Sequence, residues 1–127
     1  MRYLLDTHTL IWYFEDNSEL SYKAKSIIED TNNEIFVSMA SLWEIGIKVA
    51  LGKLTIPFDI DQIMARIRRE AMNMITIDIK HVKGIQTLPH HHRDPFDRMI
   101  IAQAKADNCT VITRDATFDA YDVPILW

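Results

Sequence analysis

Residues 3–7 read Tyr3-Leu4-Leu5-Asp6-Thr7, a short apolar run that ends at an acid. A run of this kind is typical of a buried strand. A carboxylate at the end of a buried strand needs a partner, because removing an unpaired charge from water is costly. We therefore expect Asp6 to lie at an edge of the fold where other polar groups meet.

The rest of the chain alternates short apolar runs with amphipathic segments. Further strands are expected at residues 34–37, 74–77, 109–112 and, more weakly marked, 124–126. Helices are expected over 7–14, after Ser21, from Ser38 or Ser41 to Leu51 with Gly52 as a stop, after Asp59, over 81–88, and from Pro95 to about Asp107. This order predicts an α/β fold with a short, mostly parallel sheet flanked by helices, as a single domain over residues 1–127.

Composition limits the classes of protein to consider. The 127 residues are 48% hydrophobic and 25% charged, which is ordinary for a globular domain. The only cysteine, Cys109, excludes an intrachain disulfide and a zinc site of several cysteines, and it is expected to be a buried thiol at a strand start. The first residues resemble neither a signal peptide nor a membrane span, so a cytoplasmic protein is expected. A net charge of −4 argues against non-specific duplex binding.

Four acids lie at strand ends, in a first helical turn, or in the helix that follows the second strand. They are Asp6, Glu44, Asp97 and Asp115. In a parallel sheet, ligands bind beyond the carboxyl ends of the strands, where these side chains are expected to converge. Clustered carboxylates repel one another, and Mg²⁺ or Mn²⁺ relieves that repulsion. Such a cluster suits metal-dependent hydrolysis of phosphodiesters.

Apart from Asp6, each of the four acids also has a structural explanation. Glu44 and Lys48 are spaced for an ion pair on one helix. Asp97 and Asp115 lie where a carboxylate stabilises a helix start. Asp94, directly before Pro95, is expected to cap its helix.

Three other features are expected to be structural. The run His90-His91-His92 is expected to be a solvated loop, because consecutive side chains do not all face one ion. Trp43 is expected to pack in the core, on a helix face that it shares with Ala40, Ile47 and Leu51. A cluster of cations is expected to form a solvated helix face rather than a phosphate-binding track: Arg66, Arg68 and Arg69.

Four ordered motifs, which together span most of the chain, resemble those of PIN-domain nucleases of the VapC-like branch. These are Asp6-Thr7-His8-Thr9-Leu10-Ile11-Trp12; Ser41-Leu42-Trp43-Glu44-Ile45-Gly46-Ile47-Lys48 with Leu51-Gly52-Lys53-Leu54; His92-Arg93-Asp94-Pro95-Phe96-Asp97 and the helix to Ala104; and Thr113-Arg114-Asp115 with Phe118. The resemblance implies a PIN-like fold with an acidic pocket at the sheet edge. It also implies an Mg²⁺- or Mn²⁺-dependent endoribonuclease, acting as the toxin of a toxin–antitoxin pair.

The resemblance also assigns roles to residues. Asp6, Asp97 and Asp115 would hold one or two metal ions, and Glu44 would position a water or accept its proton. Thr113 would be a supporting hydroxyl and Asp94 an auxiliary acid. The implied partners are an RNA substrate, a second copy of the chain, and an antitoxin that blocks the site with a C-terminal segment and a basic side chain. No membrane is implied.

Two other classes remain as alternatives. A non-catalytic PIN-like module that binds RNA or protein would be marked by the loss of an acid, and all four are present. A Mg²⁺-dependent receiver or phosphatase-like α/β domain would show a Lys in the last strand or Asp-x-Asp after the first. Pro124-Ile125-Leu126 and Asp6-Thr7-His8 provide neither.

Overall fold

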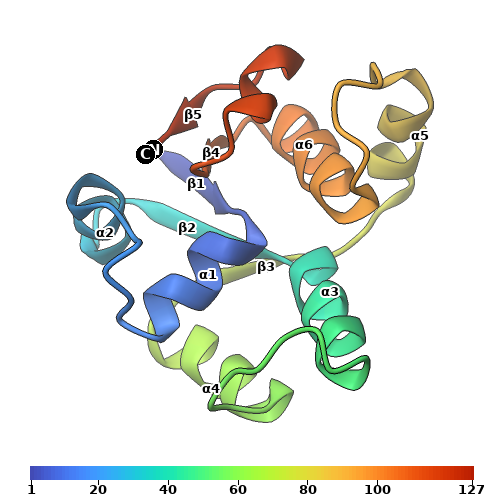
Figure 1. Ribbon diagram of the computed structural model, residues 1–127. Helices are drawn as coiled ribbons and strands as arrows, with labels where there is room; N and C mark the ends of the chain where they lie inside the picture. Colours follow the sequence, from blue (N-terminus) through green and yellow to red (C-terminus); the bar gives the residue numbers. More distant parts are fainter.

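A five-stranded parallel sheet forms the centre of the computed structural model, which describes residues 1–127 (Figure 1). The strands are β1 (Arg2–Leu5), β2 (Glu34–Ser38), β3 (Asn73–Ile75), β4 (Thr110–Ile112) and β5 (Ile125–Leu126). Their order is β3-β2-β1-β4-β5, and every neighbouring pair is parallel. The chain builds one side of the sheet outward from β1 and then the other. The order therefore reverses at β1, the kind of position where open α/β sheets bind ligands.

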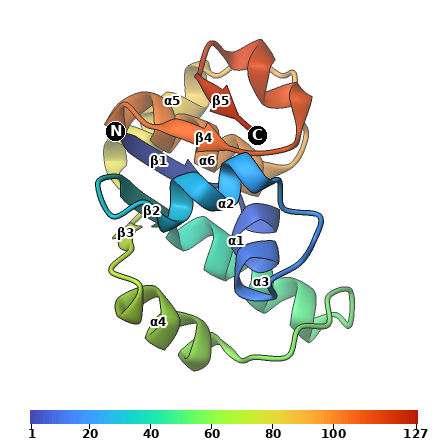
Figure 2. The same cartoon turned by 90° about the vertical axis from the view of Figure 1, so that its left-hand side faces the viewer.

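Helices cover both faces of the sheet (Figures 1 and 2). They are α1 (Thr7–Phe14), α2 (Tyr22–Glu29), α3 (Met39–Ala50), α4 (Ile60–Arg69), α5 (Ile79–Thr87) and α6 (Pro95–Asp107), followed by the 3-10 helix η1 (Ala116–Tyr121). Side chains of β1 alternate between the two faces: Tyr3 and Leu5 pack with α1 to α4, and Leu4 packs with α6 and η1. Each face therefore has its own hydrophobic core, and the sheet is the middle of three layers.

Polar residues cap the starts of three helices that lie next to the sheet. Asp6 caps α1, Ser38 caps α3 and Asp94 caps α6, in each case by accepting a hydrogen bond from a backbone N–H of the first turn. Because Asp6 directly follows β1 and Ser38 is the last residue of β2, these helices start at the carboxyl ends of the strands. Gly52, with φ of 70°, follows the end of α3 in the left-handed conformation that glycine adopts without strain.

The predicted elements are all present, with small differences at their ends. The strand predicted over 74–77 is displaced toward its amino end, because pairing with β2 covers only Asn73 to Ile75. Cys109 is buried directly before β4, as expected. Of the three arginines expected on a solvated face, Arg68 and Arg69 are exposed, but Arg66 is partly buried and donates to the Phe14 carbonyl. None of the helices has both the length and the hydrophobicity that crossing a membrane requires.

The prediction that Trp43 packs in the core is wrong. Its side chain lies on the outer surface of α3, with 59% of the residue exposed, and its ring meets only the edge of Phe96 on α6. The buried side of α3 is formed instead by a neighbouring set of residues: Ala40, Ser41, Leu42, Glu44 and Ile45. Two sides of α3 are apolar, so hydrophobic spacing alone does not identify the inner one.

Candidate active site

Asp6 lies at the junction of β1 and α1 and is almost fully buried. One carboxylate oxygen accepts the Thr9 backbone N–H at 2.9 Å, and the other accepts the Thr113 hydroxyl at 2.6 Å. Burial raises the pKa of Asp6 above its ordinary value, and these hydrogen bonds only partly oppose the rise. The fold thus holds a carboxyl group, whose ionisation is opposed by burial, in a fixed orientation at the end of the central strand.

Thr113 connects two of the predicted acids. It follows β4 directly and is buried. Its hydroxyl donates to Asp6 and accepts the backbone N–H of Asp115 at 3.0 Å. Thr113 therefore links the carboxylate of Asp6 to the backbone that begins η1 at Asp115.

Asp115 begins the 3-10 helix η1. One of its oxygens accepts the Thr117 N–H, and the other lies 2.9 Å from Nε2 of His92. Partial burial raises the pKa of Asp115, but the hydrogen bonds from Thr117 and His92 outweigh that effect and lower it below its ordinary value. Asp115 therefore ionises more readily than Asp6, whose pKa is raised.

Asp97 lies in the first turn of α6, and its surroundings strongly oppose ionisation. Burial, followed by the negative charges of Asp94, Asp6, Glu44 and Asp115, raises the pKa of Asp97 from 3.8 to about 8. All four predicted acids thus face one another closely enough to interact. Asp94 caps α6 as expected, through the N–H groups of Phe96 and Asp97, and it also adds charge to the site.

Glu44 reaches the site from α3. Only 3% of the residue is exposed, and Oε2 pairs with Lys48 one turn later. The ion pair anticipated from the sequence is present, but it is not a surface pair, because Glu44 is buried. The second oxygen, Oε1, is buried without any hydrogen-bond partner. An unpartnered carboxylate oxygen is expensive in a protein interior and is a free acceptor for a ligand or water.

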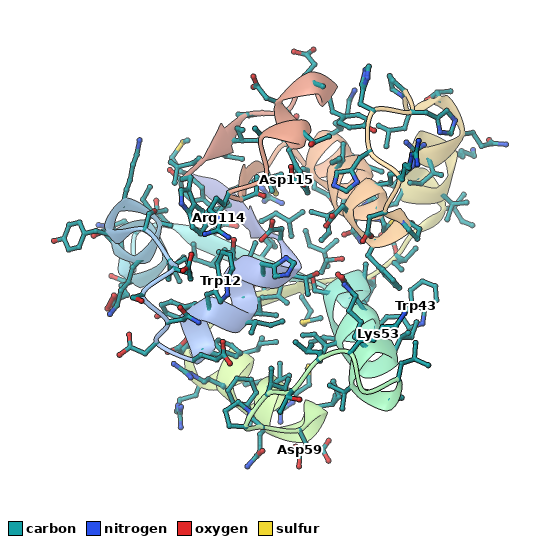
Figure 3. The ribbon with its side chains drawn as sticks, viewed as in Figure 1. Trp12, Trp43, Lys53, Asp59, Arg114 and Asp115 are labelled. Carbon is teal, nitrogen blue, oxygen red and sulfur yellow. The ribbon has the colours of Figure 1, made fainter.

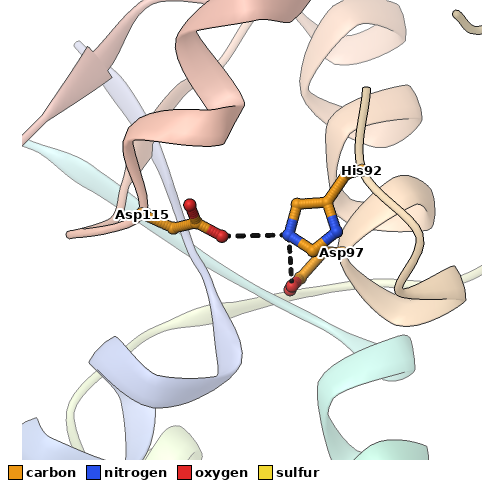
Figure 4. A group of neighbouring side chains, drawn as sticks. All are labelled: His92, Asp97 and Asp115. Carbon is orange, nitrogen blue, oxygen red and sulfur yellow. Dashed lines mark hydrogen bonds and ion pairs between the residues drawn. The ribbon is translucent and has the colours of Figure 1, made fainter. Parts of the chain in front are cut away.

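His92 is the residue that sequence reasoning missed. His90 and His91 are exposed, as expected, but His92 turns inward and its Nε2 lies 2.9 Å from Asp115 and 3.1 Å from Asp97 (Figure 4). Its Nδ1 accepts the Asp94 backbone N–H at 3.1 Å, so Nε2 carries a proton and donates to both carboxylates. The expectation that the whole histidine run is solvated is therefore wrong at His92.

The loop before α6 holds His92 in this position. The guanidinium of Arg98 is buried and donates to the carbonyls of Leu88 and Pro89, and the backbone N–H of His92 donates to the Tyr121 hydroxyl. These contacts come from α6 and η1, so no local pattern in the run reveals them. A sequence signal for the role of His92 was its position as the first residue of the third motif.

The donor set fits a divalent cation. Carboxylate oxygens of Asp97 and Asp115 lie within 4.8 Å of each other and of Nε2 of His92, which holds the two carboxylates by hydrogen bonds rather than acting as a ligand. Asp6 and Glu44 are outside this tightest group but act electrostatically on Asp97. Oxygen ligands, mutual repulsion and the unpartnered Oε1 of Glu44 are the features that an Mg²⁺ or Mn²⁺ ion would satisfy.

Several solved structures share the fold of this chain. VapBC2 from Rickettsia felis, solved bound to a DNA fragment from its promoter, matches with a TM-score of 0.72 and 18% identity over 99% of this chain and 98% of that one. FitAcB from Neisseria gonorrhoeae matches with a TM-score of 0.66 and 22% identity over 98% and 96% of the two chains. DNA-bound VapBC from Salmonella typhimurium matches with a TM-score of 0.69 and 16% identity over 99% and 97%.

The sequence comparison names the family. No curated protein sequence matches the chain. Residues 3–124 match the PIN domain, which accounts for nearly the whole chain and for the motifs that carry all four acids. The chain therefore belongs to the PIN-domain family.

Proposed function

We propose that this protein is an Mg²⁺- or Mn²⁺-dependent endoribonuclease. The observation that carries the proposal is the convergence of four acids at one sheet edge, where the pKa of Asp97 rises to about 8 and Oε1 of Glu44 has no partner. PIN domains are generally nucleases, which agrees with this chemistry. Family membership leaves no support for the receiver or phosphatase alternative, so a non-catalytic PIN module is the remaining competitor.

The proposed roles follow from the position of each group. Asp97 and Asp115 would hold the ion, with Asp6 fixed behind them by Thr113. A divalent ion bound there would compensate charge on the scissile phosphate and lower the pKa of a water that attacks it. Glu44 keeps Oε2 on Lys48 and leaves Oε1 free to accept the proton of that water. Hydrolysis is expected to leave a 5′-phosphate and a 3′-hydroxyl.

Metal removal tests this proposal. We expect protein treated with a chelator to leave structured RNA intact, and cleavage to return when Mg²⁺ or Mn²⁺ is added, as read from the RNA fragments on a gel. Calorimetric titration with Mn²⁺ alone provides a second readout. Metal binding without cleavage of any RNA would favour the non-catalytic module, whereas cleavage that persists in excess chelator would contradict the metal-dependent mechanism.

We also propose that the nuclease acts as a growth-inhibiting toxin with a cognate antitoxin. Support comes from the solved structures with the same fold, several of which are described as VapBC or toxin–antitoxin complexes. The site itself suits inhibition by a basic side chain, because its five acids outnumber the side chains that pair with them, Lys48, His92 and Thr113. A lysine or arginine from a partner segment would find carboxylates already in place.

A second copy of the chain is the other proposed partner, and α3 provides the surface. Four apolar residues at a spacing of four form a stripe along its outer side, 36% to 63% exposed: Met39, Trp43, Ile47 and Leu51. A stripe of this kind is uncommon on a monomer, and packing against the same stripe of a second copy would bury it.

The Trp43→Glu variant tests the dimer. We expect it to elute as a monomer in size-exclusion chromatography with light scattering, because a charge at the centre of the stripe opposes its burial. Tyr22→Glu, at an exposed aromatic residue on α2, is the matched control and should leave the mass unchanged. A dimer that persists in Trp43→Glu would place the interface elsewhere.

A further inference from the structure

A cavity opens beside the acids of the candidate active site. It has a volume of about 260 Å³ and is lined by Asp6, His8, Trp12, Arg114 and Asp115. Two of these residues, Asp6 and Asp115, are acids of the candidate active site, so the cavity and the site share a wall. Its volume is slightly below the range of about 300–1,000 Å³ found for sites of drug-sized ligands, so it has room for a smaller group.

The other side chains of the cavity are flat. The Arg114 guanidinium lies 4.5 Å from the centre of the Trp12 ring, and the His8 ring lies 5.5 Å from it at 40° (Figure 3 labels Trp12, Arg114 and Asp115). Trp127 packs edge-on against Trp12, and Glu19 pairs with Arg114. These contacts fix the indole and the guanidinium before any ligand arrives, which reduces the entropy lost on binding.

We propose that this cavity binds one unpaired nucleobase of single-stranded RNA, next to the phosphate held at the acidic site. The inference rests on the nuclease function proposed above and adds how the substrate is positioned. Proteins bind unstacked RNA bases on aromatic rings and on guanidinium planes, and the cavity presents both kinds of surface. A base inside a duplex stays stacked on its neighbours and does not enter, so single-stranded segments are preferred.

Arg114 brings a positive charge to the entrance of the cavity. It is half exposed, and its positive charge lies beside Asp115 in a site otherwise dominated by acids. An RNA strand that approaches the carboxylates therefore meets one cation and one aromatic surface at the same entrance. Stacking contributes to affinity without depending on which base is present, so the cavity selects unpaired RNA rather than a sequence.

Binding measurements in the Asp97→Asn background test the proposal without cleavage of the probe. The probe is a fluorescein-labelled single-stranded RNA octamer, followed by anisotropy with Mn²⁺ present. We expect Trp12→Leu, which keeps apolar bulk, and Arg114→Gln, at an exposed position, each to weaken binding about 10-fold. Trp12→Phe, which keeps a ring, should recover most of the affinity. Tyr22→Leu, an exposed aromatic residue on α2, is the control.

The outcomes separate this inference from the nuclease function. If Trp12→Leu and Arg114→Gln bind the octamer as tightly as Tyr22→Leu, the cavity proposal is overturned, even if the wild-type protein cleaves RNA. If both variants bind weakly while the wild-type protein cleaves no RNA with metal, the cavity stands and the nuclease proposal fails. Equal affinity of the parent protein for the octamer and for its duplex also overturns the cavity proposal. Circular dichroism melts test whether Trp12→Leu is folded. If it is unfolded, the affinity of Arg114→Gln alone decides the outcome.

Discussion

Asp97→Asn is expected to abolish RNA cleavage while leaving the protein folded. The substitution keeps the size of the side chain and the Asp94 cap at the start of α6, but it removes a charged ligand from the tightest group of donor atoms. Losing about 4 kcal/mol of transition-state stabilisation corresponds to a decrease in rate of about 10³-fold. Initial rates of cleavage of a fluorescent RNA, measured with saturating Mn²⁺, give this ratio directly.

The matched control is Asp61→Asn, which changes the same functional group on the exposed first turn of α4. It should cleave at the wild-type rate. Full activity of Asp97→Asn would exclude Asp97 from the site and with it the proposed mechanism. An equal loss in both variants would point to contamination or to a general effect on charge.

The same variant should be more stable than the wild-type protein when metal is absent and the pH is high. The folded state raises the pKa of Asp97 from 3.8 to about 8, so folding favours the protonated form. The resulting stability is present at low pH and is lost as the pH rises toward and through about 8. Asparagine does not ionise, so the loss should be smaller in Asp97→Asn. At pH 9 in chelator we expect a Tm about 5 °C above wild type, and at pH 4 almost no difference. A lower Tm than wild type at pH 9 would contradict the repulsion among the acids.

Much of this site follows from local sequence because Asp6, Asp97 and Asp115 lie at element boundaries. Asp6 ends an apolar run and Asp97 follows Asp94-Pro95, and these signals need no knowledge of tertiary structure. Since parallel strands bring their carboxyl ends to one edge, the order of elements was enough to predict that the acids converge. The sequence did not predict how each acid is held. An ion pair between Glu44 and Lys48 at the surface was the structural alternative for Glu44, but Glu44 is buried, and its burial depends on the way α3 packs on α1 and α6.

The residues that sequence reasoning misplaced depend on distant contacts. His92 turns inward because Tyr121 and Arg98 hold its loop, and both lie outside the histidine run. Trp43 lies outward because a second set of small and apolar residues covers the inner side of α3. Hydrophobic spacing identifies a helix and its faces, but tertiary packing decides which of two apolar faces is buried.

Arg98→Met is expected to lower the free energy of unfolding by about 3 kcal/mol, the largest stability change among these variants. Arg98 is buried on α6, and its guanidinium donates to the carbonyls of Leu88, Pro89 and His92 and to the Tyr121 hydroxyl. Methionine fills a similar space but donates no hydrogen bond, so these oxygens lose their charged donor inside the protein. Urea unfolding followed by circular dichroism measures the change.

The loop of residues 88–92 should be affected by Arg98→Met more strongly than the rest of the chain. In Arg98→Met, amide exchange is expected to accelerate over residues 88–92, because the carbonyls that Arg98 holds define the path of this loop into the site. Arg68→Met, at an exposed arginine on α4, is the control and should change neither the unfolding energy nor the exchange. If Arg98→Met were as stable as this control, the guanidinium would not hold the loop, and the inward position of His92 would depend on its other contacts: Tyr121, Asp94, Asp97 and Asp115.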